Sequence, residues 1–381
     1  MNAPGIGMPM VSRSSADKAP APVSRAHPIV GVALPLWPDR PAQEVLDVAR
    51  NALTAGLSEI WIGEMATFDA FALAAVLAAE APPTARLTIG PLPAGLRDPA
   101  ELALGLATLT TVGHCQVDLA LGASTPTVVS DWHGRPFAGV VERTAETIEA
   151  LRPILRRHRS DYQGTQVRTK DFRLWTDCSG SSIAVAASGS RMLDLAARSA
   201  DRIVLNQVTP DEVRHVRTQI DEIARETDRP APDLVVWMMA SVSPDEASMR
   251  QIARNIAIYL RQPTYREMFT RAGFGWLTEL ATRAPMREIV DTLPRSVIEL
   301  LAPIDSARAV TAAITAHAAP APTSSASSPQ RQATRGHVTS YGKSRRRRSA
   351  AMSELMAMAK RPRKAGRAWL VRAAIVCTGD G

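Results

Sequence analysis

The sequence predicts an α/β fold built on a parallel sheet, a (β/α)8 barrel, over residues 28–318. Seven short apolar segments recur along this stretch, and helical patterns separate them. Three of the helices open with the same polar signal a few residues after an apolar segment, which gives the order strand, short loop, helix. Repeated units of this order imply a parallel sheet. Seven of them favour a closed barrel over a doubly wound sheet, which stays open as the alternative.

The predicted strands are short, apolar and bounded by turn residues. They cover residues 29–34, 59–62, 87–92, 115–121, 183–187, 202–205 and 234–242. Between the first two strands, residues 41–56 carry an apolar stripe at helical spacing that ends at Gly56. Residues 68–80 are rich in Ala and Leu and predict a second helix.

The shared helix-start signal combines three kinds of residue. A capping side chain comes first, proline takes the first helical position, where no N–H is needed, and an acid takes the third. It occurs in Asp98-Pro99-Ala100-Glu101, Thr209-Pro210-Asp211-Glu212 and Ser243-Pro244-Asp245-Glu246. Each tetrapeptide predicts a helix directly after a strand.

Composition separates the chain of 381 residues into a body and two polar ends. The formal charge is +8, but residues 329–381 hold 13 Lys/Arg and 2 Asp/Glu, so the rest carries 32 bases and 35 acids. This mildly acidic body gives no support to specific nucleic-acid binding. Residues 1–27 predict a disordered leader that lacks a secretory signal, and no apolar run is long enough for a membrane span. We therefore expect a cytoplasmic protein without a membrane partner.

The segment 319–381 predicts a basic, low-complexity, disordered tail. Prolines at alternating positions after residue 318 are hostile to the eighth strand that a barrel requires. Either residues 369–377 replace that strand, or the sheet stays open and marginal. The second alternative is favoured here. The basic runs 343–349 and 360–364 predict non-specific binding of polyanions.

Ligands of a (β/α)8 barrel bind at the carboxyl ends of its strands, so the residues that follow each strand are the candidates. Glu64 could contact substrate or cofactor, or be an ordinary capping residue, and His133 could act as an acid/base group or merely bond its loop. Glycine and proline after the third strand permit close approach of a ligand or form a plain turn. The candidate cofactor-binding residues are Gly63, Glu64, Gly90, Pro91, Leu92, Gly122, Ser124, Ala187, Ser188, Gly189, Ser190 and Arg191.

The segment after the fifth strand is the most informative of these. Ser188, Gly189 and Ser190 expose backbone N–H groups at a helix N-terminus, where the helix dipole favours an anion, and Arg191 can add charge. The pattern indicates a phosphate site, although small residues also begin helices for steric reasons. The three cysteines are far apart and the histidines scattered, so neither a metal site nor a disulfide framework is predicted. A barrel with a phosphate site but no metal or nucleophile suggests that a bound cofactor carries the chemistry.

Several ordered segments resemble the luciferase-like monooxygenase superfamily and, within it, oxidoreductases that use the deazaflavin coenzyme F420. The similarity covers residues 28–318. It rests on Glu59-Ile60-Trp61-Ile62-Gly63-Glu64, Ile89-Gly90, Arg97-Asp98-Pro99-Ala100-Glu101-Leu102-Ala103, Leu119-Ala120-Leu121-Gly122, His133-Gly134-Arg135-Pro136-Phe137, Ala186-Ala187-Ser188-Gly189-Ser190-Arg191-Met192-Leu193 and Ala200-Asp201-Arg202-Ile203-Val204-Leu205-Asn206. These segments identify the superfamily more specifically than they distinguish F420 from FMN, so FMN is the alternative cofactor.

The resemblance implies transfer of a hydride between the cofactor and a small organic substrate, and often a homodimer. It places the cofactor phosphate on Ser188–Arg191 and the ring against Gly90–Leu92, where the family often has a cis peptide; here that bond would be prolyl. Residues 265–276 resemble an insertion that caps the substrate, although a plain amphipathic helix is equally compatible. The other functional hypothesis is a non-catalytic or degraded barrel that binds a ligand or partner, with the basic tail as a tether.

The sequence departs from the family's pattern at three internal positions. His114 and Asp118 stand where the family usually has Arg and Gly, and Arg202 stands where Gly is usual.

The tail resembles GC-rich DNA translated in a shifted frame. We predict that the coding DNA, read in another frame after the codon for residue 318, encodes an apolar strand followed by a helix. Translation of the two other frames checks this. If neither contains such a segment, the frame-shift hypothesis is wrong.

Overall fold

The computed structural model describes residues 29–36, 41–318 and 371–377. The predicted leader and the basic runs of the tail lie outside these ranges, so their predictions stay open. Of the helices in the described ranges, none is both long enough and apolar enough to cross a membrane.

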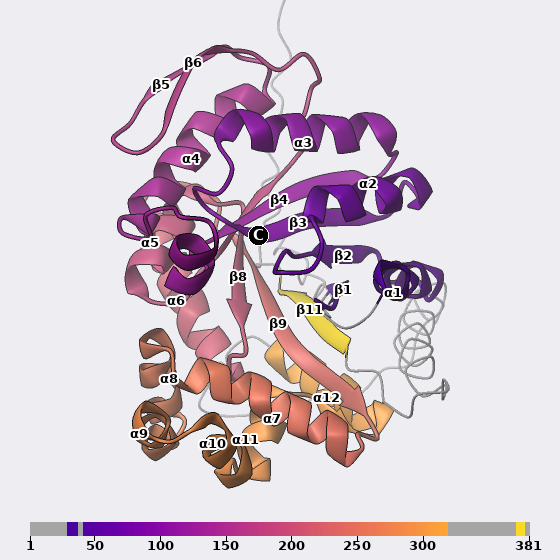
Figure 1. Ribbon diagram of the computed structural model, residues 1–381, viewed down its shortest axis with the longest axis vertical. Coiled ribbons are helices and arrows are strands. Elements are labelled where there is room, and N and C mark those ends of the chain that lie inside the picture. The colour runs from indigo at the N-terminus through magenta and orange to yellow at the C-terminus, as the bar shows by residue number, and fades with distance from the viewer. Residues whose placement is uncertain (1–28, 37–40, 319–370, 378–381) are drawn as a thin grey trace, which may run out of the picture.

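Seven parallel strands form the main sheet (Figure 1). Each pairs with the next in the order β1, β2, β3, β4, β7, β8, β9. Their bounds are β1 (Ile29–Ala33), β2 (Glu59–Ile62), β3 (Arg86–Pro93), β4 (Gln116–Gly122), β7 (Ile183–Ala186), β8 (Arg202–Asn206) and β9 (Asp233–Val242). All seven predicted strands are confirmed, with ends that differ by at most a residue.

Helices alternate with these strands and cover the outer face of the sheet (Figure 1). The larger ones are α1 (Ala42–Thr54), α2 (Ala70–Glu80), α3 (Pro99–Val112), α4 (Val140–Leu155), α5 (Ser190–Ser199), α6 (Pro210–Glu226) and α7 (Glu246–Leu260). A group of short helices follows β9, namely η2 (Pro263–Tyr265), α8 (Arg266–Arg271), α9 (Gly275–Arg283), α10 (Met286–Thr292), α11 (Arg295–Leu301) and α12 (Ala307–His317). A π-helix, η1 (Thr127–Trp132), follows β4.

Two of the three predicted helix starts are confirmed and the third is displaced. Asp98 caps α3 in a full capping box, and Thr209 caps α6. The third helix, α7, begins at Glu246 with Asp245 as its cap, two residues later than predicted. Ser243 has a left-handed φ of 50°, and its N–H donates to the carbonyl of Asp305 at 2.7 Å. The backbone at Ser243 is therefore still bonded to the neighbouring strand, so the helix cannot begin there and starts two residues later.

A separate antiparallel hairpin, β5 (Ser160–Gln163) with β6 (Arg168–Phe172), lies between α4 and β7. Sequence analysis expected only helical patterns between strands and missed it. Its residues are largely polar and exposed, so no apolar alternation marked them as strands.

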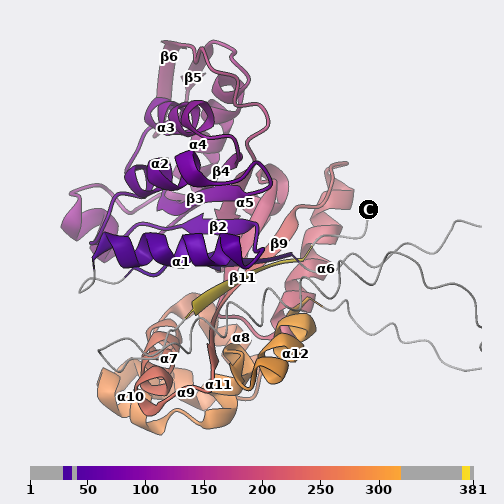
Figure 2. The ribbon, with the colours of Figure 1, turned by 90° about the vertical axis from the view of Figure 1, so that its right-hand side faces the viewer.

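The eighth position of the sheet is filled from the end of the chain. After α11 comes only the two-residue strand β10 (Ile304–Asp305), paired with β9. The strand β11 (Val371–Cys377) lies antiparallel between β9 and β1 (Figure 1), and Figure 2 shows it beside β9. Strand-to-strand pairing that starts at β1 and passes through β2, β3, β4, β7, β8, β9 and β11 therefore returns to β1. Of the two alternatives that the sequence left, these pairings support replacement of the missing strand from within residues 369–377 over the favoured open sheet. The bounds of the tail stay a prediction. Pairing with β11 satisfies two backbone edges that would otherwise be exposed.

Side chains alternate between two cores along each strand, as a pleated sheet requires. On β2, Ile60 and Ile62 belong to the large core beneath the helices, whereas Trp61 belongs to a smaller cluster enclosed by the strands. Trp61 and Trp237 meet edge to face there, with ring centroids 5.5 Å apart. The two tryptophans fill the middle of the strand ring.

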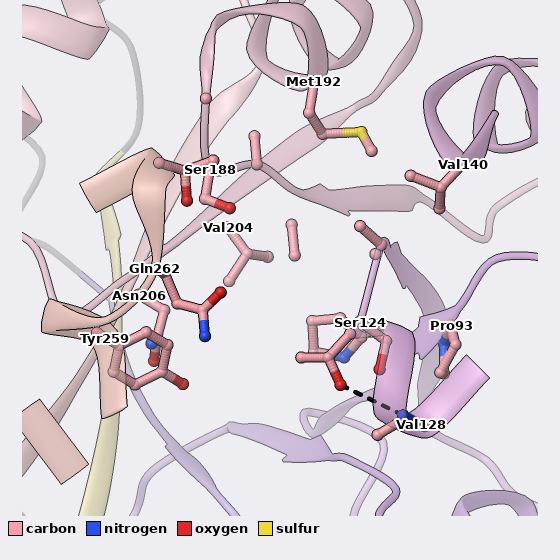
Figure 3. Close-up of a pocket in the computed structure, with 18 of the residues that line it drawn as sticks. Pro93, Ser124, Val128, Val140, Ser188, Met192, Val204, Asn206, Tyr259 and Gln262 are labelled. Carbon is pink, nitrogen blue, oxygen red and sulfur yellow. Dashed lines mark hydrogen bonds between the residues drawn. The ribbon is translucent and has the colours of Figure 1, made fainter. Parts of the chain in front are cut away.

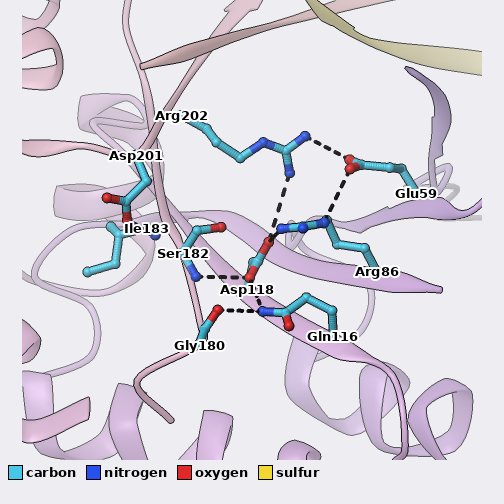
Figure 4. Close-up of polar contacts among 9 residues, drawn as sticks. All are labelled: Glu59, Arg86, Gln116, Asp118, Gly180, Ser182, Ile183, Asp201 and Arg202. Carbon is cyan, nitrogen blue, oxygen red and sulfur yellow. Dashed lines mark hydrogen bonds and ion pairs between the residues drawn. The ribbon is translucent and has the colours of Figure 1, made fainter. Parts of the chain in front are cut away.

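Four charged side chains close the N-terminal end of the ring (Figure 4); we call them the charged plug. Arg202 donates to Glu59 at 2.8 Å, and Arg86 donates to Asp118 and lies 3.4 Å from Glu59. Glu59, Asp118 and Arg202 are almost fully buried. Burial alone would lower the pKa of Arg86, but the charge and hydrogen bond of Asp118 outweigh it, so the pKa is raised.

The plug explains two departures from the family's pattern together. Asp118 and Arg202 lie 3.9 Å apart. Asp118 also pairs with Arg86 and Arg202 with Glu59, and Arg86 and Glu59 in turn face each other. Asp118 precedes Gly122 by four residues on β4, about 13 Å at the rise of a strand. The two unusual residues therefore compensate each other's charge at the end of the ring opposite the strands' carboxyl ends.

We predict that Arg202→Met destabilises the fold by about 3–5 kcal/mol, because Arg86 alone is then left to balance the two buried carboxylates of Glu59 and Asp118. Urea denaturation followed by circular dichroism measures the change. The matched control is Arg198→Met, which removes an exposed pair with Asp194 and should cost less than about 1 kcal/mol. If Arg202→Met lowers the free energy of unfolding by no more than Arg198→Met does, the charged plug does not stabilise the fold as described.

We also predict that the fold loses stability as the pH falls below about 6.5, the ordinary pKa of histidine. Burial lowers the pKa of His317, which lies between the carbonyls of Ala313 and Val208. Below pH 6.5 the unfolded chain therefore binds a proton that the folded chain does not yet bind, which favours unfolding. Denaturation midpoints between pH 7.5 and 5 should fall less steeply for His317→Gln than for the parent. If the denaturation midpoint falls equally with pH in both proteins, the loss of stability does not come from His317.

Candidate functional site

A cavity of about 820 Å³ opens at the carboxyl ends of the parallel strands (Figure 3). It lies above the two tryptophans, at the end opposite the charged plug. The small residues Gly63, Gly122 and Ala186 stand where these strands reach the cavity and leave room in it. A side chain at Gly122 would contact Pro91 and Ala186 at about 3.4 and 3.3 Å.

Most of the predicted cofactor-binding residues line this cavity. They are Gly63, Glu64, Pro91, Gly122, Ser124, Ala187, Ser188, Gly189, Ser190 and Arg191. Gly90 and Leu92 do not line it, because Leu92 points into the outer core and Gly90 is pressed against β4. A Cβ on Gly90, whose φ is 117°, would lie 2.2 Å from the carbonyl oxygen of Ala120. The Gly90–Pro91 peptide is cis, in the prolyl form that the sequence implied.

The N-terminus of α5 faces the cavity without a side-chain cap. Gly189 takes the N-cap position at a φ of 100°, and no side chain accepts from the first amides of the helix. A Cβ on Gly189 would lie 3.1 Å from Thr264 of the opposite wall. Ser188 and Ser190 flank this glycine with hydroxyl groups at the cavity surface. Open amides and a helix dipole at one point form a binding site for an anion such as phosphate.

Arg191 lines the cavity but does not point an unpaired charge into it. Its guanidinium pairs with Glu142 of α4, and the side chain is largely exposed. The anion site therefore depends first on backbone amides.

Glu64 is held firmly in the cavity wall. Its two oxygens accept from Arg97 at 2.9 and 2.8 Å, and one also accepts from the N–H of Ala70 at 3.1 Å. Arg97 in addition donates to Asp69, the cap of α2. These contacts make Glu64 a link between β2 and the helices around it.

His133 does not come together with Glu64. It ends the π-helix η1 as an exposed residue and is not among those that line the cavity. In the described parts of the chain, no three His, Cys, Asp or Glu side chains gather in a way that could hold a metal ion.

Sequence reasoning missed a polar wall formed by β8 and the C-terminal end of α7. Asn206, Tyr259 and Gln262 line the cavity on this side (Figure 3). The predicted sixth strand ended at residue 205, one short of Asn206. Period-two alternation from Arg202 through Val204 would have placed Asn206 inside the ring.

The expected capping segment 265–276 contributes only its first residue. Tyr265 lines the cavity and donates from its hydroxyl to the carbonyl of Asn206 at 2.8 Å. Phe269 is buried in the outer core, Phe274 packs against that core, and Trp276 is exposed away from the cavity. The segment therefore supports the cavity wall and does not cover its mouth with aromatic side chains.

The fold is shared with several solved flavin and deazaflavin enzymes. The F420-dependent tetrahydromethanopterin reductase from Methanopyrus kandleri superposes with a TM-score of 0.66 at 18% identity, over 76% of this chain and 90% of that one. An F420-dependent secondary alcohol dehydrogenase gives 0.60 at 16% identity, over 75% and 88%. The FMN-containing oxygenating component of 3,6-diketocamphane monooxygenase from Pseudomonas putida gives 0.54 at 17% identity, over 77% and 88%.

The similarity extends to the sequence. A family model described as luciferase-like monooxygenase matches residues 21–324, which is most of the chain and includes all seven parallel strands and the cavity they support. The order of the parallel strands agrees with that match. The chain therefore belongs to the luciferase-like monooxygenase family.

Proposed function

We propose that the cavity binds a flavin-type cofactor and that the protein transfers a hydride between this cofactor and a small organic substrate. The family and the similar structures are oxidoreductases and monooxygenases, which supports the general class. F420 is the first candidate because two of the similar structures are named as F420-dependent. FMN is the alternative, since it is bound in a third.

The observation that carries the proposal is the uncapped N-terminus of α5 at the cavity surface. Residues 188–191 are exposed at the cavity surface. The amides at an uncapped helix N-terminus can donate to an anion, so a cofactor phosphate would bind around Gly189. Both candidate cofactors carry a phosphate on a flexible side chain. The hydroxyls of Ser188 and Ser190 stand beside these amides and would add donors.

The rest of the cavity suits a flat ring system. Its volume falls within the range of roughly 300–1,000 Å³ that small-molecule sites occupy. Pro91 and Gly122 give a wall without projecting polar groups, and the side chains of Val140, Met192 and Val204 add apolar surface (Figure 3). We assign the ring to this apolar region and the phosphate to the loop that ends at Arg191.

A flavin-type cofactor, when bound, supplies the site that accepts or donates the hydride. The chain's own residues position the reactants and exclude water. Trp237 lines the cavity and packs edge to face on Trp61 beneath it, and the ion pair of Glu64 with Arg97 fixes the rim. We keep Glu64 as a positioning residue, because both of its oxygens already accept hydrogen bonds. A catalytic role of His133 stays a prediction.

One observation favours the alternative of a barrel without catalysis. The eighth strand position is filled by β11, which runs antiparallel to both of its neighbours, β9 and β1, whereas the other seven strands of the ring are parallel. In barrels generally, loops after the seventh and eighth strands help to bind phosphate. Here the anion site follows β7, the fifth parallel strand, so it does not depend on the substituted position.

We predict saturable binding of F420 or FMN to the purified protein, at least tenfold weaker in Gly189→Val. Valine is strained at a φ of 100°, and its Cβ would press on Thr264 and displace the open amides. Fluorescence titration with each cofactor measures the dissociation constant, and tenfold corresponds to about 1.4 kcal/mol.

The matched control is Gly273→Val. Gly273 also has a positive φ, 84°, but no atom lies within 4 Å of its Cβ, and it lies outside the cavity. It should bind the cofactor like the parent. Absence of cofactor binding in the folded parent protein would support the non-catalytic alternative. Equal cofactor affinity of Gly189→Val and the parent would contradict the proposal that the phosphate binds at the N-terminus of α5.

A further inference from the structure

We propose that Asn206, on the polar wall of the cavity, recognises an uncharged amide-like group of the substrate, in which an N–H donor stands beside a C=O acceptor. Lactams, imides and cis-amides have this arrangement. The inference deepens the proposed function, since it rests on that function for regarding the ligand as the substrate rather than the cofactor.

The side chain of Asn206 is the starting observation. Both its Nδ2 and Oδ1 are buried, and neither has a hydrogen-bond partner within the described structure. A buried carboxamide without partners is costly, and native proteins rarely leave one unsatisfied unless a ligand or water completes it. Asn206 lines the cavity, so a bound molecule would complete both atoms once a rotation of the side chain turns them toward it.

The backbone holds this side chain at the cavity. Asn206 pairs with Trp237 of β9 at the end of β8, and its carbonyl accepts from the Tyr265 hydroxyl at 2.8 Å. Tyr265 in turn packs against Tyr259, with ring centroids 5.1 Å apart. These contacts fix the main chain of Asn206, so its side chain is presented from a rigid wall.

The chemistry of the carboxamide defines its ligand. Oδ1 requires a donor and Nδ2 requires an acceptor, and the two atoms lie side by side in one plane. An N–H next to a C=O satisfies both atoms at once, whereas a ketone satisfies only Nδ2. Tyr259 and Gln262, on the same wall, can bond the remaining polar atoms of such a ligand (Figure 3).

The charges around the cavity favour a neutral ligand. The charged side chains among the described lining residues are Glu64 and Arg191, and each is paired, with Arg97 and Glu142 respectively. No unpaired charge among the described lining residues is therefore available to balance an ionic substrate in the cavity.

The polar wall is also separate from the region assigned to the ring. Asn206, Tyr259 and Gln262 lie on one side of the cavity, and Pro93 and Ser124 lie on the other (Figure 3). Pro93 is on the same strand as Pro91, and Ser124 follows Gly122 by two residues, so the wall assigned to the ring is on that other side. A substrate on the polar wall and a ring on the apolar wall would face each other across the cavity. That is the arrangement a direct hydride transfer requires.

The test uses two probes of the same ring size, 2-pyrrolidinone, which is a lactam, and cyclopentanone, which has no N–H. Ligand-observed NMR titrations of the full-length protein, without cofactor, give their dissociation constants. We expect the parent to bind the lactam about tenfold more tightly than the ketone, the effect of roughly one neutral hydrogen bond. Asn206→Leu should bind both probes equally.

The control is Gln207→Met, which removes a neighbouring carboxamide that bonds Asn255 and lies outside the cavity. It should keep the preference for the lactam, and circular dichroism verifies that each variant is folded. Equal binding of the probes by the parent, or a preference that persists in Asn206→Leu, would overturn the proposal.

A second titration, of the lactam in the presence of saturating F420 or FMN, separates this proposal from the proposed function. Unchanged lactam binding supports a substrate subsite beside the cofactor. Mutual exclusion would overturn the assignment to substrate, because Asn206 would then serve the cofactor. If neither cofactor binds but the lactam preference holds, Asn206 still recognises amides and the proposed function fails alone.

Discussion

The charged plug is the constraint on which the rest of this structure depends. Buried charges are tolerated only where opposite charges and hydrogen bonds compensate them. Glu59, Arg86, Asp118 and Arg202 meet that condition only when β2, β3, β4 and β8 converge at one end of the ring. The guanidinium of Arg202 also lies 5.1 Å from the centre of the Trp61 ring, which ties the plug to the aromatic layer above it. One end of the ring is thereby closed.

This closure leaves the opposite end free for ligand binding. Small residues at the carboxyl ends of the strands produce a cavity where the plug and the tryptophans do not reach. The anion site at α5 and the polar wall at Asn206 follow neighbouring strands, β7 and β8. The positions proposed for the cofactor phosphate, the cofactor ring and the substrate would then lie around the same cavity. A hydride could therefore pass directly between substrate and cofactor.

The parts of the fold that could be predicted are those set by local sequence. Apolar periodicity located the seven parallel strands, and capping residues located α3 and α6, because both signals act within a few residues. The hairpin β5–β6 has no apolar alternation, and β11 depends on pairing with β1 and β9, segments more than a hundred residues away. In the site, small residues revealed the α5 loop. Asn206 stood only at the end of a segment that carries the family resemblance, and its lack of a hydrogen-bond partner is visible only in three dimensions.

The crystal structure of the protein soaked with F420, and in parallel with FMN, tests the central claim most directly. Our account predicts that the phosphate of one of them lies within hydrogen-bond distance of the backbone amides between Ser188 and Arg191. It also predicts that the ring lies against Pro91 and Gly122, with Asn206 left free to face it. A phosphate held elsewhere, or a cavity that stays empty with both cofactors at saturating concentration, would contradict the account.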